Sequence, residues 1–137
     1  MPFRLHERLG TDVYKSDPFG WVSNIVGPEN SKHGWGNVIR LTGTCSWMNI
    51  AATQYLLGVR VKLDGVKLDP CIPSDWKEFR VERDYLGCRL NITFRNPNGV
   101  SKGVTAVTVD GVRYETNTVS KELLKGKTQA EIVAIMG

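Results

Sequence analysis

The sequence has few of the residues that build metal sites and disulfide frameworks. Its only cysteines and histidines are Cys45, Cys71, Cys88, His6 and His33. An odd number of widely spaced cysteines argues against a disulfide framework, and neither histidine lies at metal-ligand spacing from a cysteine. We therefore expect no metal site and no bound cofactor. Cys45 and Cys71 have no obvious base beside them, so we expect both to be small buried residues.

Long apolar runs are absent as well. No stretch reaches the roughly 18 apolar residues that a membrane-spanning helix needs. The N-terminus also lacks the apolar core of a signal peptide. These absences predict a protein without a membrane partner, located in the cytoplasm with reduced thiols.

The chain contains no block of basic residues. It has 18 Lys and Arg against 14 Asp and Glu, which gives a net charge of +4. The basic residues of the second half alternate with acidic ones, and no nucleic-acid-binding motif is present. We therefore expect no nucleic-acid partner, although the isoelectric point is near 9.1.

The residues that are present indicate a globular fold of modest size. Hydrophobic residues make up 41% and charged residues 23% of the 137 positions, as is usual for globular domains. This length fits one ordinary domain or a small domain with an attached segment, and it is too short for a large enzyme barrel.

The first half of the sequence predicts helices separated by a polar loop. One short helix is expected to end at Gly10, and a second is expected over residues 17–27. Asp17 would cap the second helix and Gly27 would end it. Residues 28–38 are rich in Gly, Asn and Ser, which is typical of a loop.

A more strongly patterned helix is expected over residues 44–57. Its apolar residues surround most of the helix instead of forming one narrow stripe. Such a helix requires neighbours on several sides, and few other helices are predicted in this chain. We expect it to expose apolar surface, so that the chain either self-associates, including as a homo-oligomer, or frays over residues 1–58.

From residue 59 onward, apolar and polar residues alternate, which is typical of β-strands. Asp64-Gly65 and Asp110-Gly111 are hairpin turn signals, and residues 96–99 form a further turn. Strands are expected at residues 59–63, 66–68, 79–82, 89–94, 104–109, 112–114 and 130–136. This spacing predicts a mainly β fold, an antiparallel two-layer β-sandwich of jelly-roll type.

Two stretches of the sequence resemble a known family. They are LTGTCSWMNIAATQYLLGVRVKLDGVKLDPCIPSDWKEFRV and, further on, RNPNGVSKGVTAVTVDG. Both are similar to the C-terminal end of the inverting glycoside phosphorylases. That family includes cellobiose, cellodextrin and chitobiose phosphorylases and the phosphorylase-like part of cyclic β-1,2-glucan synthase. The resemblance covers about residues 17–137.

The resemblance implies a domain organisation. Family members are several times longer and carry an (α/α)6 barrel with the active site, followed by a C-terminal β-sandwich. Residues 1–58 would then be the last helical segments of an incomplete barrel, and residues 59–137 the terminal sandwich. The barrel helices expected to surround residues 44–57 would lie outside this sequence.

The resemblance also implies a reaction. In the family, phosphate attacks the anomeric carbon of a β-linked disaccharide or oligosaccharide, and a carboxylic acid on the opposite face protonates the leaving oxygen. The configuration inverts and an α-sugar 1-phosphate forms, as in a single-displacement glycosidase with phosphate in place of water. Inorganic phosphate is a substrate here, and the resemblance implies no cofactor. The general-acid aspartate would lie before position 1, so we expect this chain alone to be inactive.

Thr42 and Gly43 match the threonine-glycine pair that binds phosphate in the family. The first turn of a helix offers unpaired N–H groups and a positive dipole end, and glycine allows close approach of an anion. From these residues alone, a plain helix cap at Thr42 or Thr44 is the more common role. With the resemblance, phosphate binding is expected at Thr42 and Gly43, and capping at Thr44.

Other polar and aromatic residues are expected to be structural. His33 lies in a polar loop and is expected to be solvated. Trp76 is expected to fill the junction between the domains. The acidic pairs Asp75/Glu78 and Glu82/Asp84 are expected to be surface charges. No catalytic residue is assigned to this chain.

A different class of function also fits the second half of the sequence. The strands alone are compatible with a non-catalytic β-sandwich module that is structural or binds carbohydrate weakly. The sequence thus predicts a C-terminal fragment of a glycoside phosphorylase, with such a module as the alternative.

Overall fold

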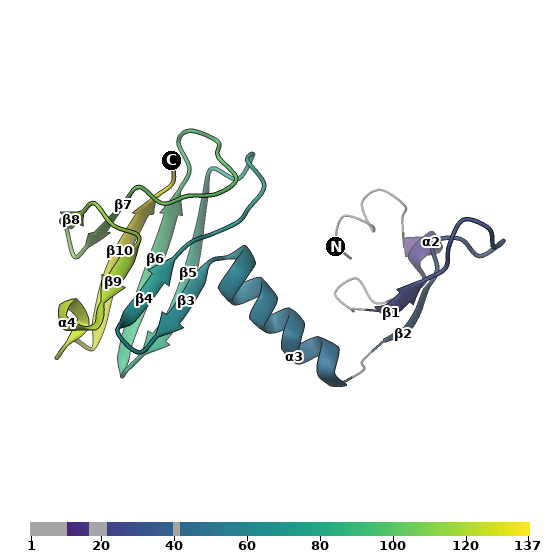
Figure 1. Ribbon diagram of the computed structural model, residues 1–137, viewed down its shortest axis with the longest axis horizontal. Coiled ribbons are helices and arrows are strands. Elements are labelled where there is room, and N and C mark those ends of the chain that lie inside the picture. The colour runs from purple at the N-terminus through teal and green to yellow at the C-terminus, as the bar shows by residue number, and fades with distance from the viewer. Residues whose placement is uncertain (1–10, 17–21, 40–41) are drawn as a thin grey trace. The chain divides into compact units, whose positions relative to one another are not determined.

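The computed structural model describes residues 11–16, 22–39 and 42–137 (Figure 1). The chain divides into two compact units, Met1–Asn49 and Ile50–Gly137. Each unit is described by itself. Within the described residues, no helix is long and apolar enough to cross a membrane.

The first unit contains a short helix and a two-stranded antiparallel sheet. Its elements are α2 (Thr11–Tyr14), β1 (Val22–Ile25) and β2 (Gly36–Ile39). Asn24 of β1 pairs with Asn37 of β2. Tyr14 is buried, and a Cβ on Gly36 would lie 3.1 Å from its ring. The small residue therefore allows the strand to approach the Tyr14 ring closely.

The helix expected over residues 17–27 is wrong at its C-terminal end, because residues 22–25 form strand β1. Val22 and Ile25 are β-branched and pair across the sheet with Ile39 and Gly36. Pairing with a distant segment overrides the local helix signal. The expected cap at Asp17 and the short helix ending at Gly10 lie outside the described residues.

The apolar helix expected over residues 44–57 is confirmed, but its second half is a π-helix and not an α-helix. Helix α3 (Thr42–Ile50) is followed directly by a π-helical segment, η1 (Ala51–Leu56). The Leu57 N–H donates to the Ala52 carbonyl at 2.8 Å, five residues earlier. The helix begins two residues before the expected start, so Thr44 lies inside its first turn and not at its cap.

The second unit is a β-sandwich of two sheets, which confirms the mainly β fold (Figure 1). The five-stranded sheet has the order β5 (Glu78–Tyr85), β6 (Cys88–Arg95), β10 (Gln129–Ile135), β7 (Ala106–Val109), β8 (Val112–Tyr114). The three-stranded sheet has the order β3 (Val59–Lys62), β4 (Gly65–Leu68), β9 (Thr118–Ser120). A single helical turn, α4 (Lys121–Leu124), follows β9.

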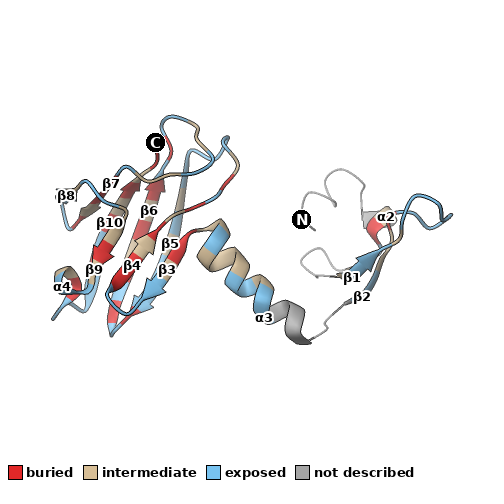
Figure 2. Ribbon diagram, viewed as in Figure 1, coloured by how far each residue is buried: buried red, intermediate tan, exposed pale blue. Residues whose placement is uncertain are grey.

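The core of the sandwich comes from the alternation seen in the sequence. On β6, every second residue from Cys88 to Phe94 is buried, and the residues between them are not (Figure 2). Phe94 stacks on Phe79 of β5 with ring centroids 4.5 Å apart. Apolar residues from both sheets form one continuous cluster with these side chains. Burial of one face of each sheet supplies the main stabilisation of this unit.

One strand pair departs from the antiparallel pattern. β10 pairs with β7 antiparallel, but it pairs with β6 in parallel over its whole length, from Gln129↔Arg89 to Ile135↔Arg95. Between β6 and β10 the chain passes through β7, β8, β9 and α4. This long connection allows β10 to return in the direction of β6.

Two of the three predicted turns are in the expected place. The turn of residues 96–99 is present, with the Gly99 N–H donating to the Asn96 carbonyl at 3.4 Å, and Asp110-Gly111 joins β7 to β8. The turn between β3 and β4 is shifted by one residue to Leu63-Asp64. Gly65 instead begins β4, where a Cβ would overlap the Val119 carbonyl of β9.

Candidate functional site

The candidate phosphate seat lies in the first turn of α3. Thr42 and Gly43 are the first two residues of this helix, and no acidic residue lies in its first turn. The leading N–H groups of a helix have no intrahelical partner and carry the positive end of its dipole. The backbone here could therefore hold an anion, with no neighbouring carboxylate in the turn to oppose it.

The rest of the helix exposes large apolar side chains. Trp47 is 69% exposed, Ile50 38% and Tyr55 56%. A helix of a globular protein usually buries such residues. The expectation that this helix leaves apolar surface uncovered in the chain is therefore confirmed.

The C-terminal end of the helical segment is attached closely to the sandwich. Gly58 has φ +73°, and a Cβ there would overlap the backbone of Asp69 and Pro70. The Asp69 N–H donates to the Gly58 carbonyl at 2.8 Å, and the Cys71 N–H donates to the Leu56 carbonyl at 2.9 Å. Residues 69–71 therefore run against the end of η1 and satisfy carbonyl groups that a helix end leaves free.

Arg60 adds a side-chain link at the same place, which the sequence did not predict. Its Nε donates to the Gln54 carbonyl at 3.0 Å, and its guanidinium carbon lies 4.7 Å from the Tyr55 ring centroid. It also forms an ion pair with Asp69 at 3.4 Å. Arg60 thereby links β3 to η1 by a hydrogen bond and a cation–π contact, and it links β3 to the segment after β4 by the ion pair with Asp69. Its position four residues after the end of η1 and five residues after Tyr55 was the available signal.

Several residues considered in the sequence prove to be surface residues. His33 is exposed in a turn, as expected. Glu78 pairs with Arg80 and Arg95 on the sheet surface. Glu82 and Asp84 both pair with Arg89, and all three are more than half exposed. These carboxylates are surface charges, as predicted.

The other cysteine and tryptophan expectations have mixed outcomes. Cys71 is exposed, so its expected burial is wrong. Residues 69–73 lie outside the named strands, and the backbone of Cys71 forms an isolated bridge to Lys102 besides its hydrogen bond to Leu56. Trp76 lies edge-on against Phe79 at 5.9 Å and is 40% exposed. Its proposed place between the domains stays a prediction. The side chain of Cys45 lies outside the described residues.

A shallow groove of about 290 Å³ lies on the strands β5, β6 and β10. It is lined by Arg80, Val81, Glu82, Asn91, Ile92, Thr93 and Glu131. None of these residues is aromatic, so the groove offers no ring on which a sugar could stack. It gives no support to the alternative of a carbohydrate-binding module.

The family model and the relatives that match this chain indicate the same family. Residues 2–58 match the glycosyl hydrolase 94 superfamily, catalytic domain. The chain is 40% identical over 110 residues to N,N'-diacetylchitobiose phosphorylase of Vibrio furnissii, which is 80% of this chain and 14% of that protein. It is 49% identical over 70 residues to 3-O-beta-D-glucopyranosyl-beta-D-glucuronide phosphorylase of Paenibacillus borealis, which is 51% of this chain and 9% of the relative.

A more distant relative extends the match along the chain. It is the cyclic beta-(1,2)-glucan synthase of Rhizobium meliloti, 24% identical over 119 residues, which is 87% of this chain and 4% of that protein. The chain thus spans only a small part of the length of each relative. The predicted resemblance to the C-terminal part of the glycoside phosphorylases is confirmed. Residues 2–58 are thus similar to a segment of the catalytic domain of the glycosyl hydrolase 94 superfamily, and the chain is similar over up to 80% of its length to N,N'-diacetylchitobiose phosphorylases.

Proposed function

We propose that this chain forms part of the phosphate site and the terminal β-sandwich of an inverting glycoside phosphorylase. The enzyme would cleave a β-linked disaccharide or oligosaccharide reversibly with phosphate and release an α-sugar 1-phosphate. The domain division at residues 58 and 59 belongs to this proposal. The observation that carries it is the helix turn with Thr42 and Gly43, inside the segment that matches the catalytic domain.

The chemistry of the turn supports this role. Phosphate needs several donors at once, and the first-turn N–H groups of α3 are directed outward along the helix axis. Gly43 has no Cβ to hold the anion away from the backbone, and a threonine hydroxyl can donate one further hydrogen bond. Bound in this way, the phosphate would be positioned to act as the nucleophile in a single displacement.

Phosphate titration of the isotope-labelled chain tests the seat directly. We expect saturable amide shifts centred on Gly43 when phosphate replaces chloride at constant ionic strength. Gly43→Ala should abolish them, because the added Cβ blocks the approach. Alanine favours the helix by about 1 kcal/mol over glycine, so the helix itself should survive.

Gly27→Ala is the matched control for this variant. A Cβ at Gly27 would meet nothing within 4 Å, and phosphate binding should be unchanged. Equal phosphate affinity in the Gly43→Ala and wild-type chains would contradict the proposal. So would flat signals from an intact α3, which would leave Thr42 and Gly43 as an ordinary helix start.

A further inference from the structure

The tight turn between β5 and β6 contains an unusual residue. Leu86 and Gly87 form this two-residue turn, with φ of +49° and +81°. Turns of this type require positive φ at both positions and favour Asn, Asp or Gly at the first. The left-handed backbone conformation costs a leucine at this position about 1 kcal/mol of conformational strain. The corresponding turn between β7 and β8 has the favoured residue, Asp110, at φ +46°.

Burial does not compensate for this strain. The Leu86 side chain is 80% exposed and packs into neither sheet. Leu86 is therefore unfavourable in the folded chain for two reasons, the backbone strain and the exposed apolar surface. Residues of this kind are concentrated where a protein makes a contact with something else.

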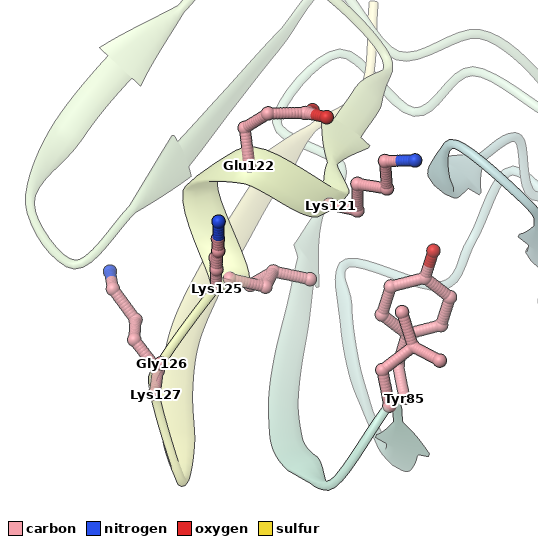
Figure 3. A pocket seen from close by; sticks show the side chains of 8 residues that line it. Tyr85, Lys121, Glu122, Lys125, Gly126 and Lys127 are labelled. Carbon is pink, nitrogen blue, oxygen red and sulfur yellow. The ribbon is translucent and has the colours of Figure 1, made fainter.

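Leu86 is one of the residues that line a pocket of about 620 Å³, which we call the Leu86 pocket. Figure 3 shows this pocket from close by. Its apolar part comes from Tyr85, Leu86 and Leu124, and its polar part from Lys121, Glu122, Lys125 and Lys127, with Gly126 between the last two. The volume is within the range of ligand-binding pockets. The whole pocket lies in the Ile50–Gly137 unit, so it is independent of the proposed phosphate seat.

The charges around the Leu86 pocket are unbalanced. Lys127 forms an ion pair with Asp110, and its side chain extends away from Tyr85 (Figure 3). Backbone and Ser120 hydroxyl hydrogen bonds hold the pKa of Glu122 below its usual range, so this carboxylate is already hydrogen-bonded. Among the residues that the structure describes, Lys121 and Lys125 form no ion pair with a carboxylate. Two ammonium groups thus remain for an external anion.

We propose that the Leu86 pocket is a docking site for an acidic protein segment. One large apolar side chain of that segment would pack against Leu86, and its carboxylates would lie beside Lys121 and Lys125. An exposed apolar side chain on a hairpin turn is suited to act as the anchor of a protein interface. The adjacent unpaired lysines favour a partner of negative charge.

Titration of the labelled 137-residue chain with a capped hexapeptide, Glu-Asp-Phe-Leu-Glu-Asp, tests this proposal. We expect saturable amide shifts at residues 85–87 and 121–127. The matched peptide Gln-Asn-Phe-Leu-Gln-Asn keeps the apolar side chains and lacks the charges. It should bind about tenfold more weakly.

Leu86→Asn separates docking from folding. Asparagine is favoured at this turn position, so the variant should be more heat-stable than the wild type and yet bind the peptide at least about tenfold more weakly. Leu63→Asn is the matched control, because Leu63 is 96% exposed on the turn between β3 and β4. Its peptide affinity should be unchanged. Lys125→Glu should weaken binding, and Lys125→Arg should retain it.

Several results would overturn the proposal. They are the absence of saturable shifts, equal affinity for the two peptides, or unchanged affinity in Leu86→Asn. Shifts at residues 85–87 that depend on the concentration of the chain alone would assign the pocket to a second copy of the chain. That result would also contradict the proposal that an acidic protein segment occupies the pocket.

Discussion

At the scale of single residues, Gly58 controls how the helical segment enters the sandwich. Its φ of +73° is accessible to glycine without strain, and residues 69 and 70 pass directly beside its Cα. The bonds from the Asp69 N–H to the Gly58 carbonyl and from the Cys71 N–H to the Leu56 carbonyl depend on that close approach. A side chain at residue 58 would separate η1 from the segment that satisfies its end.

We expect Gly58→Ala to lower the free energy of unfolding by about 2–4 kcal/mol, because the Cβ adds an overlap with the backbone to an unfavourable φ. Gly87→Ala isolates the effect of the unfavourable φ from that of the overlap, since Gly87 has φ +81° and open space around it. Its cost should be about 1 kcal/mol. Urea denaturation of both variants measures the difference. Equal losses would show that the overlap is relieved by a small backbone shift.

At the scale of elements, Asp110 ties the β7–β8 hairpin to β10. Its carboxylate accepts a hydrogen bond from the Glu131 N–H at 2.8 Å and pairs with Lys127. Its own N–H donates to the Glu131 carbonyl at 2.8 Å. The hydrogen bonds from Lys127 and from the Glu131 backbone hold the pKa of Asp110 below its ordinary value.

This lowered pKa predicts a loss of stability in acid. A carboxylate whose pKa is lower in the folded than in the unfolded chain stabilises the fold above the unfolded pKa, near 4. That stabilisation disappears as the pH falls through the folded pKa. Urea denaturation between roughly pH 6 and pH 2 should therefore show a decline that is smaller in Asp110→Asn. Lys127→Gln keeps the hydrogen bond from the Glu131 N–H to Asp110. Its decline in stability should therefore lie between those of the wild type and Asp110→Asn. An identical acid profile in wild type and Asp110→Asn would contradict this assignment.

At the scale of the whole molecule, the uncovered apolar side chains on α3 and η1 matter most. Trp47, Ile50 and Tyr55 are all exposed in the chain as it stands. The chain spans 14% or less of the length of the relatives described above. Exposed apolar side chains gathered on one helical segment favour association.

We expect the 137-residue chain to self-associate through this helix or to fray over residues 1–58. Sedimentation velocity over a range of concentrations measures the first, and amide exchange measures the second. Trp47→Lys should reduce the association, because it removes the most exposed ring of the helix. Leu63→Lys makes the same charge change on a lone exposed leucine and should have little effect. A monodisperse monomer with strong amide protection throughout residues 44–57 would contradict this expectation.

Local patterns were sufficient to predict much of the sandwich, and the resemblance of two sequence stretches to a known family predicted the family. Alternation of apolar and polar residues identified β5, β6 and β10, and Asp110-Gly111 identified one hairpin turn. The apolar residues around the predicted helix also implied missing neighbours. These signals are carried by residues close together in the chain, so they can be recognised without a structure. Thr42 and Gly43 remain predicted phosphate ligands.

Only the tertiary structure decided the features that depend on distant residues. Val22–Ile25 became a strand because β2 pairs with it, and β10 runs parallel to β6 because the chain first crosses to the other sheet. The link from Arg60 to Gln54 and Asp69 requires β3, β4 and η1 to meet. Local propensities differ by about 1 kcal/mol or less, so pairing and packing between distant segments override them.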